Sequence, residues 1–133
     1  DYEEGTWTPA LPNGGSVNSI AAARYTKIGG LVQAQCYITC GSIPNNGSHF
    51  QIGGLPYTPN QSNAFGGGTI NYGAYANYDV YQNPIVHASH NYIYFHRSDG
   101  TPSPVTNSII YANAGSQGSG NLVLILNVTF RHY

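Results

Sequence analysis

The feature that most constrains this chain is a glycine pair, Gly29 and Gly30, set between two runs of strand-forming residues. Glycine adopts the positive φ angles that a two-residue hairpin turn requires. The sequence therefore predicts a β-hairpin over Arg24–Cys40. The expected cross-strand pairs are Ile28 with Leu31, Tyr25 with Ala34, and Ala23 with Cys36.

Apolar and polar side chains alternate along both predicted strands. The expected buried face carries Ala21, Ala23, Tyr25, Val32, Ala34, Cys36 and Ile38. The expected solvent face carries Arg24, Thr26, Gln33, Gln35 and Thr39. An antiparallel sheet with one buried face needs this alternation, and a slip of one residue would bury the glutamines.

The last strand is apolar on one face throughout and on both faces in its first half. Its continuous apolar face consists of Leu122, Leu124, Leu126, Val128 and Phe130. On the opposite face, the first half of the strand is apolar, with Val123 and Ile125. The second half of that face is polar, with Asn127, Thr129 and Arg131. Such a strand is either central in a sheet or located at a subunit interface.

Further short strands are predicted between turn signals. They comprise Phe50–Ile52, Gly67–Tyr75, two strands within Ile85–Arg97 around Ser89–Asn91, and Ser108–Asn113. No window has a helical period, so eight to ten strands indicate an all-β fold. We predict one domain over residues 1–133, a single antiparallel β-sandwich of jelly-roll type.

Polarity in this chain is carried by neutral groups, because only 7% of the residues are charged and the formal net charge is -1. Nucleic-acid binding needs clustered Lys and Arg, of which the chain has 4 in total, so we expect none. The apolar runs are too short to cross a bilayer, and we expect no membrane insertion. The first residue is Asp1, which indicates a piece of a longer protein.

Cys36 and Cys40 are the only cysteines. Along an extended strand their Cα atoms are about 13 Å apart, whereas a disulfide needs roughly 4.4 to 6.8 Å. We therefore expect two unpaired thiols on the buried face. The single tryptophan, Trp7, is expected to pack across one end of the sheet, with ligand stacking as the alternative.

Four segments together resemble a known family. They are DYEEGTWTP at the start, RYTKIGGLV in the hairpin, GLPYTP at Gly54 to Pro59, and a last β-strand that ends in an aromatic and basic tail. In these segments the chain resembles the C-terminal domain of bacteriophage tail fibres and tailspikes. The resemblance implies a homotrimeric β-domain at the distal end of an adhesion fibre, located in the virion tail outside the cell.

The resemblance also implies partners. They are two further copies of the chain, upstream segments of the fibre or tailspike, and a polysaccharide or protein on the bacterial host surface. A receptor-binding tip is the function we expect. The alternative is a purely structural cap for trimerisation and folding, with recognition located elsewhere in the fibre.

Aromatic and polar groups alternate densely in one part of the chain, as sugar recognition requires. The candidate glycan-binding residues are Tyr75, Tyr78, Asp79, Tyr81, His87, His90, Asn91 and Tyr92. The alternative for each of them is ordinary loop packing. The candidate trimer-interface residues are Val32, Cys36, Ile38, Val123 and Ile125.

Few residues of the sequence could support catalysis or metal binding. A glycosidase needs two carboxylates flanking one bond, and outside the N-terminal DYEE only Asp79 and Asp99 are available. His87, His90 and His96 invite a metal on a three-fold axis, but His87 and His90 would point to opposite faces unless a turn intervenes. We predict no enzyme activity, no cofactor and no bound metal.

Overall fold

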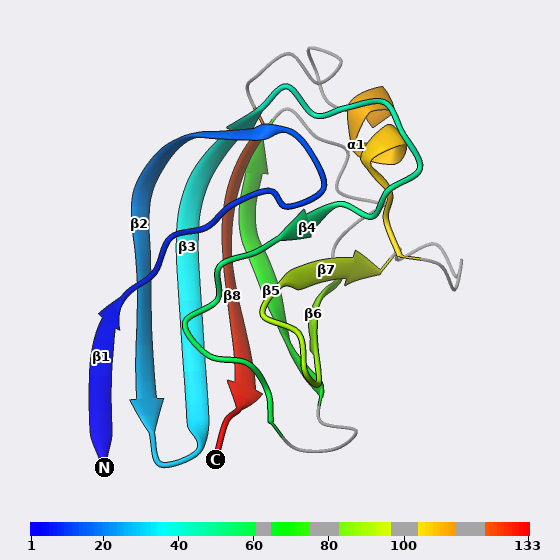
Figure 1. The fold of residues 1–133 in the computed structure, drawn as a ribbon. Coiled ribbons are helices and arrows are strands. Elements are labelled where there is room, and N and C mark those ends of the chain that lie inside the picture. The colour runs from blue at the N-terminus through cyan, green and yellow to red at the C-terminus, as the bar shows by residue number, and fades with distance from the viewer. Residues whose placement is uncertain (61–64, 75–82, 97–103, 114–121) are drawn as a thin grey trace.

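The structure is a computed structural model that describes residues 1–60, 65–74, 83–96, 104–113 and 122–133. It contains eight strands and one helix within these ranges (Figure 1). In chain order they are β1 (Tyr2–Thr6), β2 (Ser16–Ile28), β3 (Leu31–Gly41), β4 (Gln51–Ile52), β5 (Phe65–Ala74), β6 (Asn83–His87), β7 (Ile93–His96), α1 (Asn107–Asn113) and β8 (Leu122–Arg131).

The eight strands form one antiparallel sheet in the order β1-β2-β3-β8-β5-β6-β7-β4. The long strands β2, β3, β8 and β5 lie side by side, and the short strands β6, β7 and β4 curl over from the β5 edge (Figure 1). The prediction of an antiparallel all-β fold is confirmed. The two layers of the sandwich are the two halves of a single curled sheet.

The predicted hairpin has the predicted register. Ile28 pairs with Leu31, as the turn at Gly29 and Gly30 requires. The pairs of Tyr25 with Ala34 and Ala23 with Cys36 are confirmed as well. Gly29 has a φ of 57°, and open space surrounds the position of its missing Cβ, so backbone conformation alone accounts for glycine there.

The prediction that Ala21 lies on the buried face is wrong. The register between β2 and β3 shifts between Ile20 and Ala22, which marks a bulge in β2. A bulge adds one unpaired residue and changes which face the following side chains occupy. Ala21 is consequently exposed, while Ala23, beyond the bulge, is buried.

Strand β8 is central, as the doubly apolar pattern predicts. It pairs with β3 on one side and with β5 on the other. Its alternate residues, from Leu122 to Phe130, are at most 2% exposed. Val123 and Ile125 point to the opposite face of the sheet and are half-buried.

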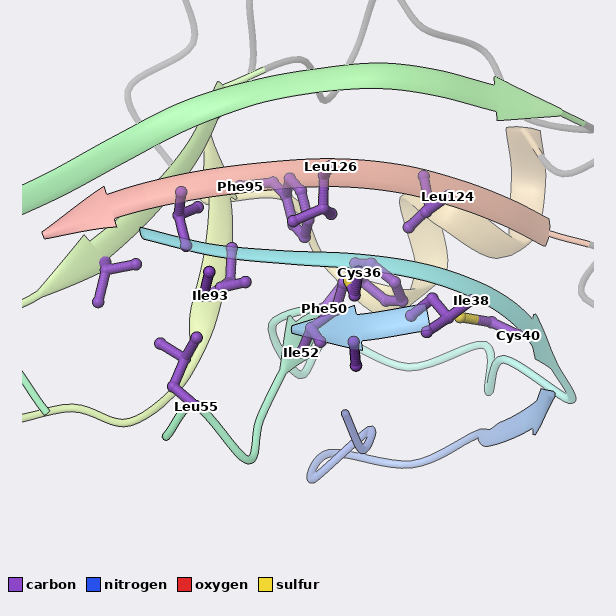
Figure 2. Close-up of a cluster of buried hydrophobic side chains, with 14 of the residues drawn as sticks. Cys36, Ile38, Cys40, Phe50, Ile52, Leu55, Ile93, Phe95, Leu124 and Leu126 are labelled. Carbon is purple, nitrogen blue, oxygen red and sulfur yellow. The ribbon is translucent and has the colours of Figure 1, made fainter. Parts of the chain in front are cut away.

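The core lies between the two halves of the curled sheet. Figure 2 shows side chains from both halves gathered in one cluster. Each of the following is at most 2% exposed: Cys36, Ile38, Phe50, Ile52, Ile93, Phe95, Leu124 and Leu126. The rings of Phe50 and Phe95 lie 5.6 Å apart and join the segment before β4 to β7.

The two cysteines occupy the positions expected of them, and Trp7 is buried over two strands. Cys36 and Cys40 are buried free thiols, and burial raises the pKa of each to about 12. The Trp7 indole is 7% exposed, and its Nε1–H donates to the carbonyl oxygens of Arg24, at 3.2 Å, and Gln35, at 3.1 Å. Trp7 therefore packs over the β2–β3 layer.

The predicted strand at Ser108–Asn113 is wrong, because this segment lies in helix α1. A tertiary contact holds the helix start, because the Asn107 side-chain amide donates to the Asn13 carbonyl at 3.0 Å. The first helical hydrogen bond runs from Ile110 N–H to the Thr106 carbonyl at 3.2 Å. Ile110 is 1% exposed in the core. No helix among the described residues is long and apolar enough to span a membrane.

Candidate functional site: an aromatic groove

A groove of about 240 Å³ opens on the outer side of the short-strand half of the sheet. It is smaller than the roughly 300 to 1,000 Å³ of pockets for drug-sized ligands. Its volume therefore suits one small ring system. The lining residues are His49, Gln51, His87, His90, Tyr92, Tyr94, His96 and Pro104.

Strand alternation on β7 separates the groove from the core. Ile93 and Phe95 point inward and are at most 1% exposed. Tyr94 and His96 point to the other side of the strand, where they line the groove. The period-two pattern of a strand thus places apolar residues in the core and polar aromatic residues in the groove.

The rim of the groove comes from distant parts of the chain. Gln51 of β4 pairs with Tyr94 of β7, so that the two residues are neighbours across the strands. His49 forms an isolated bridge with Thr106, and Pro104 forms one with His96. Three separate chain segments therefore meet at this site.

A tight turn brings His87 and His90 together. Ser89 has a φ of 68°, its N–H donates to the Pro59 carbonyl at 2.9 Å, and His90 N–H donates to the His87 carbonyl at 3.2 Å. A positive φ is rare for a residue other than glycine, and here the bond to Pro59 supports it. The two imidazole rings consequently lie 5.2 Å apart.

Six rings follow one another from the start of β5 into the groove, and we call them the aromatic row. Consecutive centroids are separated by 4.4, 5.2, 4.7, 6.3 and 5.4 Å. Only one neighbouring pair, His90 and Tyr92, is stacked, with an angle of 16° between the ring planes. The row consists of Phe65, His87, His90, Tyr92, Tyr94 and His96.

The groove presents neutral hydrogen-bonding groups. No Asp, Glu, Lys or Arg is among its lining residues within the described ranges. Burial, and secondly the neighbouring Tyr92, raise the pKa of the Tyr94 hydroxyl, which keeps that group protonated. In the part of the chain that the structure describes, no three His, Cys, Asp or Glu side chains are placed to hold a metal ion.

The structure brings three of the predicted glycan-binding residues into one site. His87, His90 and Tyr92 all line the groove. Asn91 lies between them in sequence but is exposed, and its backbone carbonyl accepts from Leu55 N–H at 3.1 Å. The other four predicted residues lie outside the described residues: Tyr75, Tyr78, Asp79 and Tyr81.

Sequence reasoning did not assign five of the eight lining residues to the binding site. Tyr94 and His96 share a face with Tyr92 in the predicted strand, and this alternation is the signal that could have found them. His49, Gln51 and Pro104 carry no such signal, because only the pairing of β4 with β7 and the isolated bridges bring them close.

The predicted trimer-interface residues fall on two different faces. Val32, Cys36 and Ile38 are at most 2% exposed and fill the core of the protomer itself, so they have no surface to offer to a partner. Val123 and Ile125 lie on the outer face of β8. Any interface on these strands must therefore use the outer face.

A second cluster joins the segments that carry the family resemblance. Glu3 Oε1 accepts from the hydroxyls of Tyr25 and Tyr57, each at 2.5 Å. Both bonds lower the pKa of Glu3, and the bond from Tyr25 has the larger effect. The bond to Glu3 in turn raises the pKa of Tyr57 to about 12. The Tyr57 ring also lies 4.8 Å from that of His132 and 5.6 Å from Lys27 Nζ. We call these five residues the motif cluster.

The fold can be compared with solved structures. The crystal structure of the Dettilon tailspike protein (gp208) matches this chain with a TM-score of 0.69. The chain has a tailspike-like fold. The match covers 97% of this chain but 23% of that protein, at 17% sequence identity, so the likeness concerns the fold of one segment. No protein-family model matches the sequence, and the search of curated proteins found no relative.

Proposed function

We propose that this chain is a domain of a phage tail fibre or tailspike that binds a glycan on the host surface through the aromatic groove. The proposal places the domain in the virion tail, outside the cell, joined to upstream segments of the fibre. Its likeness to a segment of the Dettilon tailspike protein supports a tail-associated role.

The aromatic row is the observation that carries the proposal. Sugars present C–H groups on the faces of their rings and hydroxyl groups around the edges, so they pack on aromatic faces and need neutral hydrogen-bond partners. The groove supplies both, with the rings of His90 and Tyr92 as aromatic contacts and Gln51 on the rim. Tyr78 and Tyr81, which lie outside the described residues, remain part of the proposal on the sequence alone.

The proposed role is binding without catalysis. Hydrolysis of a glycosidic bond requires an acid and a second carboxylate on either side of that bond. The described lining of the groove contains no carboxylate. Glu3, which lies in the motif cluster, is engaged by two tyrosine hydroxyls. Asp79 and Asp99 lie outside the described residues.

We further propose that the domain assembles as a homotrimer through the outer face of β3 and β8. Tyr37, which is 42% exposed, pairs with Ile125, and Thr39 pairs with Val123. Together they form an uncharged surface next to a hollow of about 460 Å³ that Tyr37 and Ile125 line. An uncharged surface with aromatic and aliphatic side chains is typical of subunit interfaces.

A structural cap is the second candidate, and the same outer face favours it, because that face could mediate assembly without any receptor. The two functions differ in one measurement. A trimer that binds no glycan would support the cap, whereas a trimer that binds through the groove would support the receptor-binding domain.

Binding to an array of bacterial surface polysaccharides tests the proposal. Tyr92→Ala removes a central ring of the aromatic row and should weaken binding by about fivefold, because one aromatic contact contributes on the order of 1 kcal/mol. Tyr2→Ala is the matched control, since Tyr2 is 64% exposed on the edge strand β1. Equal binding by both variants would refute the groove as the site. Tyr78→Ala and Tyr81→Ala extend the test to the predicted binding residues outside the described ranges.

A further inference from the structure

His87 is held in one tautomer by its own turn. Its Nδ1 lies 3.0 Å from the carbonyl oxygen of Ala88. A carbonyl oxygen only accepts hydrogen bonds, so Nδ1 carries the proton and donates it. In the neutral ring the other nitrogen, Nε2, is then a lone-pair acceptor.

His90 is held in the opposite tautomer by burial. Its Nδ1 is buried and has no hydrogen-bond partner among the described residues. A buried N–H without an acceptor is rarer and costlier than a buried lone pair without a donor. The proton therefore resides on Nε2, which makes this nitrogen a donor.

The two nitrogens left for a ligand are thus an acceptor on His87 and a donor on His90. We propose that this pair binds one hydroxyl group of a neutral sugar, which donates to His87 Nε2 and accepts from His90 Nε2–H. A hydroxyl is the group that does both at one oxygen. This inference rests on the proposed function and specifies which chemical group of the glycan the groove binds.

The spacing of the rings fits a single bridging oxygen. Two hydrogen bonds of about 2.7 to 3.2 Å to one oxygen place their nitrogens roughly 4 to 6 Å apart. The ring centroids of His87 and His90 are 5.2 Å apart, which leaves room for one oxygen to contact an edge nitrogen of each ring. Tyr92 stacks on His90 with centroids 4.7 Å apart, so its ring lies next to this pair.

The same tautomers argue against a metal ion between the two rings. A metal needs the lone pair of each imidazole, and the Nε2 of His90 carries a proton. A carboxylate or phosphate would need donors on both sides, and His87 Nε2 is an acceptor. The neutral hydroxyl is the ligand group that matches both nitrogens without any proton transfer.

The first test measures the tautomers in the ligand-free domain. Long-range proton–nitrogen correlation NMR of the complete 133-residue chain distinguishes protonated from unprotonated ring nitrogens. We expect the Nδ1–H form for His87 and the Nε2–H form for His90. Finding the same tautomer in both rings would overturn the inference, even if the groove binds polysaccharide.

The second test uses methyl glycosides of glucose, galactose and mannose at millimolar concentration, followed by their single-deoxy and single-O-methyl forms. We expect one hydroxyl whose removal and whose methylation each weaken binding about tenfold, because that hydroxyl both donates and accepts. Zn²⁺ is the competing probe. Binding of Zn²⁺ between the rings, or of none of the glycosides, would overturn the inference.

Conservative variants separate hydrogen bonding from packing. Glutamine reaches the position of Nε2 with an amide that donates or accepts, whereas asparagine reaches only the position of Nδ1. His87→Asn and His90→Asn should weaken glycoside binding about tenfold, and His87→Gln and His90→Gln should retain most of it. Equal losses of glycoside binding in the Asn and Gln variants would contradict the hydroxyl-binding role. If the wild-type chain binds no polysaccharide on the arrays, that result would instead contradict the proposed function.

Discussion

The Tyr57 hydroxyl donates to Glu3 Oε1 at 2.5 Å across 54 positions of the chain. Tyr25 donates to the same oxygen, and the ring of His132 packs 4.8 Å from that of Tyr57. Each of these residues comes from a different one of the four segments that resemble tail-fibre sequences. The resemblance therefore has a structural basis: the four segments meet in the motif cluster and tie both ends of the chain to the hairpin.

Glu3 should make the stability of the domain depend on pH on the acid side. Its pKa is lowered in the folded state by the tyrosine hydroxyls, so its contribution is present above the ordinary value of 4.5 and is lost as pH falls below it. Glu3→Gln should flatten the fall of the melting temperature in this range. Tyr25→Phe, which removes the hydroxyl that lowers this pKa most, should flatten the same fall in part. Identical curves for Glu3→Gln and the wild type would contradict the assignment.

The cysteines should resist thiol reagents while the domain is folded. Burial raises the pKa of Cys36 and Cys40 from 9.0 to about 12, so both remain protonated and shielded at pH 8. We expect no reaction with a colorimetric disulfide reagent at that pH, and release of two equivalents of product after addition of denaturant. Because the pKa of each thiol is higher in the folded protein than in the unfolded chain, the contribution of the protonated thiols to stability is lost as pH rises from about 9 toward 12. Fast labelling of the native domain would contradict the burial.

Two adjacent glycines of β5 should differ sharply in their tolerance of alanine. A Cβ at Gly68 would overlap the carbonyl oxygen of Asn127 on β8, and backbone there cannot move without breaking the ladder. A Cβ at Gly67 would meet only the Pro84 carbonyl oxygen, at 3.5 Å, which is ordinary contact. We expect Gly68→Ala to lower the free energy of unfolding by about 2 to 3 kcal/mol and Gly67→Ala by less than about 1 kcal/mol. Chemical denaturation measures both.

Some of the contacts behind these predictions could be predicted from the sequence, and others could not. The hairpin register could be predicted because the turn glycines and the alternation on both strands are local and agree with each other. The central position of β8 was predictable because both faces of its first half are apolar. In each case the residues of one short stretch are sufficient for the prediction.

The rest depends on contacts between distant segments. The strand-like composition of Ser108–Asn113 is overridden in α1 by the bonds of Asn107 and by burial of Ile110. His49 enters the groove only through its bridge to Thr106. The bulge that exposes Ala21 has no signal in the sequence, since alanine is compatible with either face.

Assembly should depend on the outer face of β8. Ile125→Glu places a charge on this face without disturbing the core, so we expect the mass in solution to fall from that of a trimer to that of a monomer. Thr6→Glu is the control, because Thr6 is exposed on the edge strand β1. Light scattering measures the mass. A wild-type domain that is already monomeric at micromolar concentration would refute the trimer.

The central claim, that the aromatic groove binds the glycan, is tested most directly by the histidine ring signals in NMR. The chain has five histidines; His49, His87, His90 and His96 line the groove, and His132 packs against Tyr57 in the motif cluster. On titration with an oligosaccharide from a polysaccharide that binds the domain, the four groove signals should shift and that of His132 should stay in place. A bound oligosaccharide that leaves the four groove signals unmoved would contradict the account.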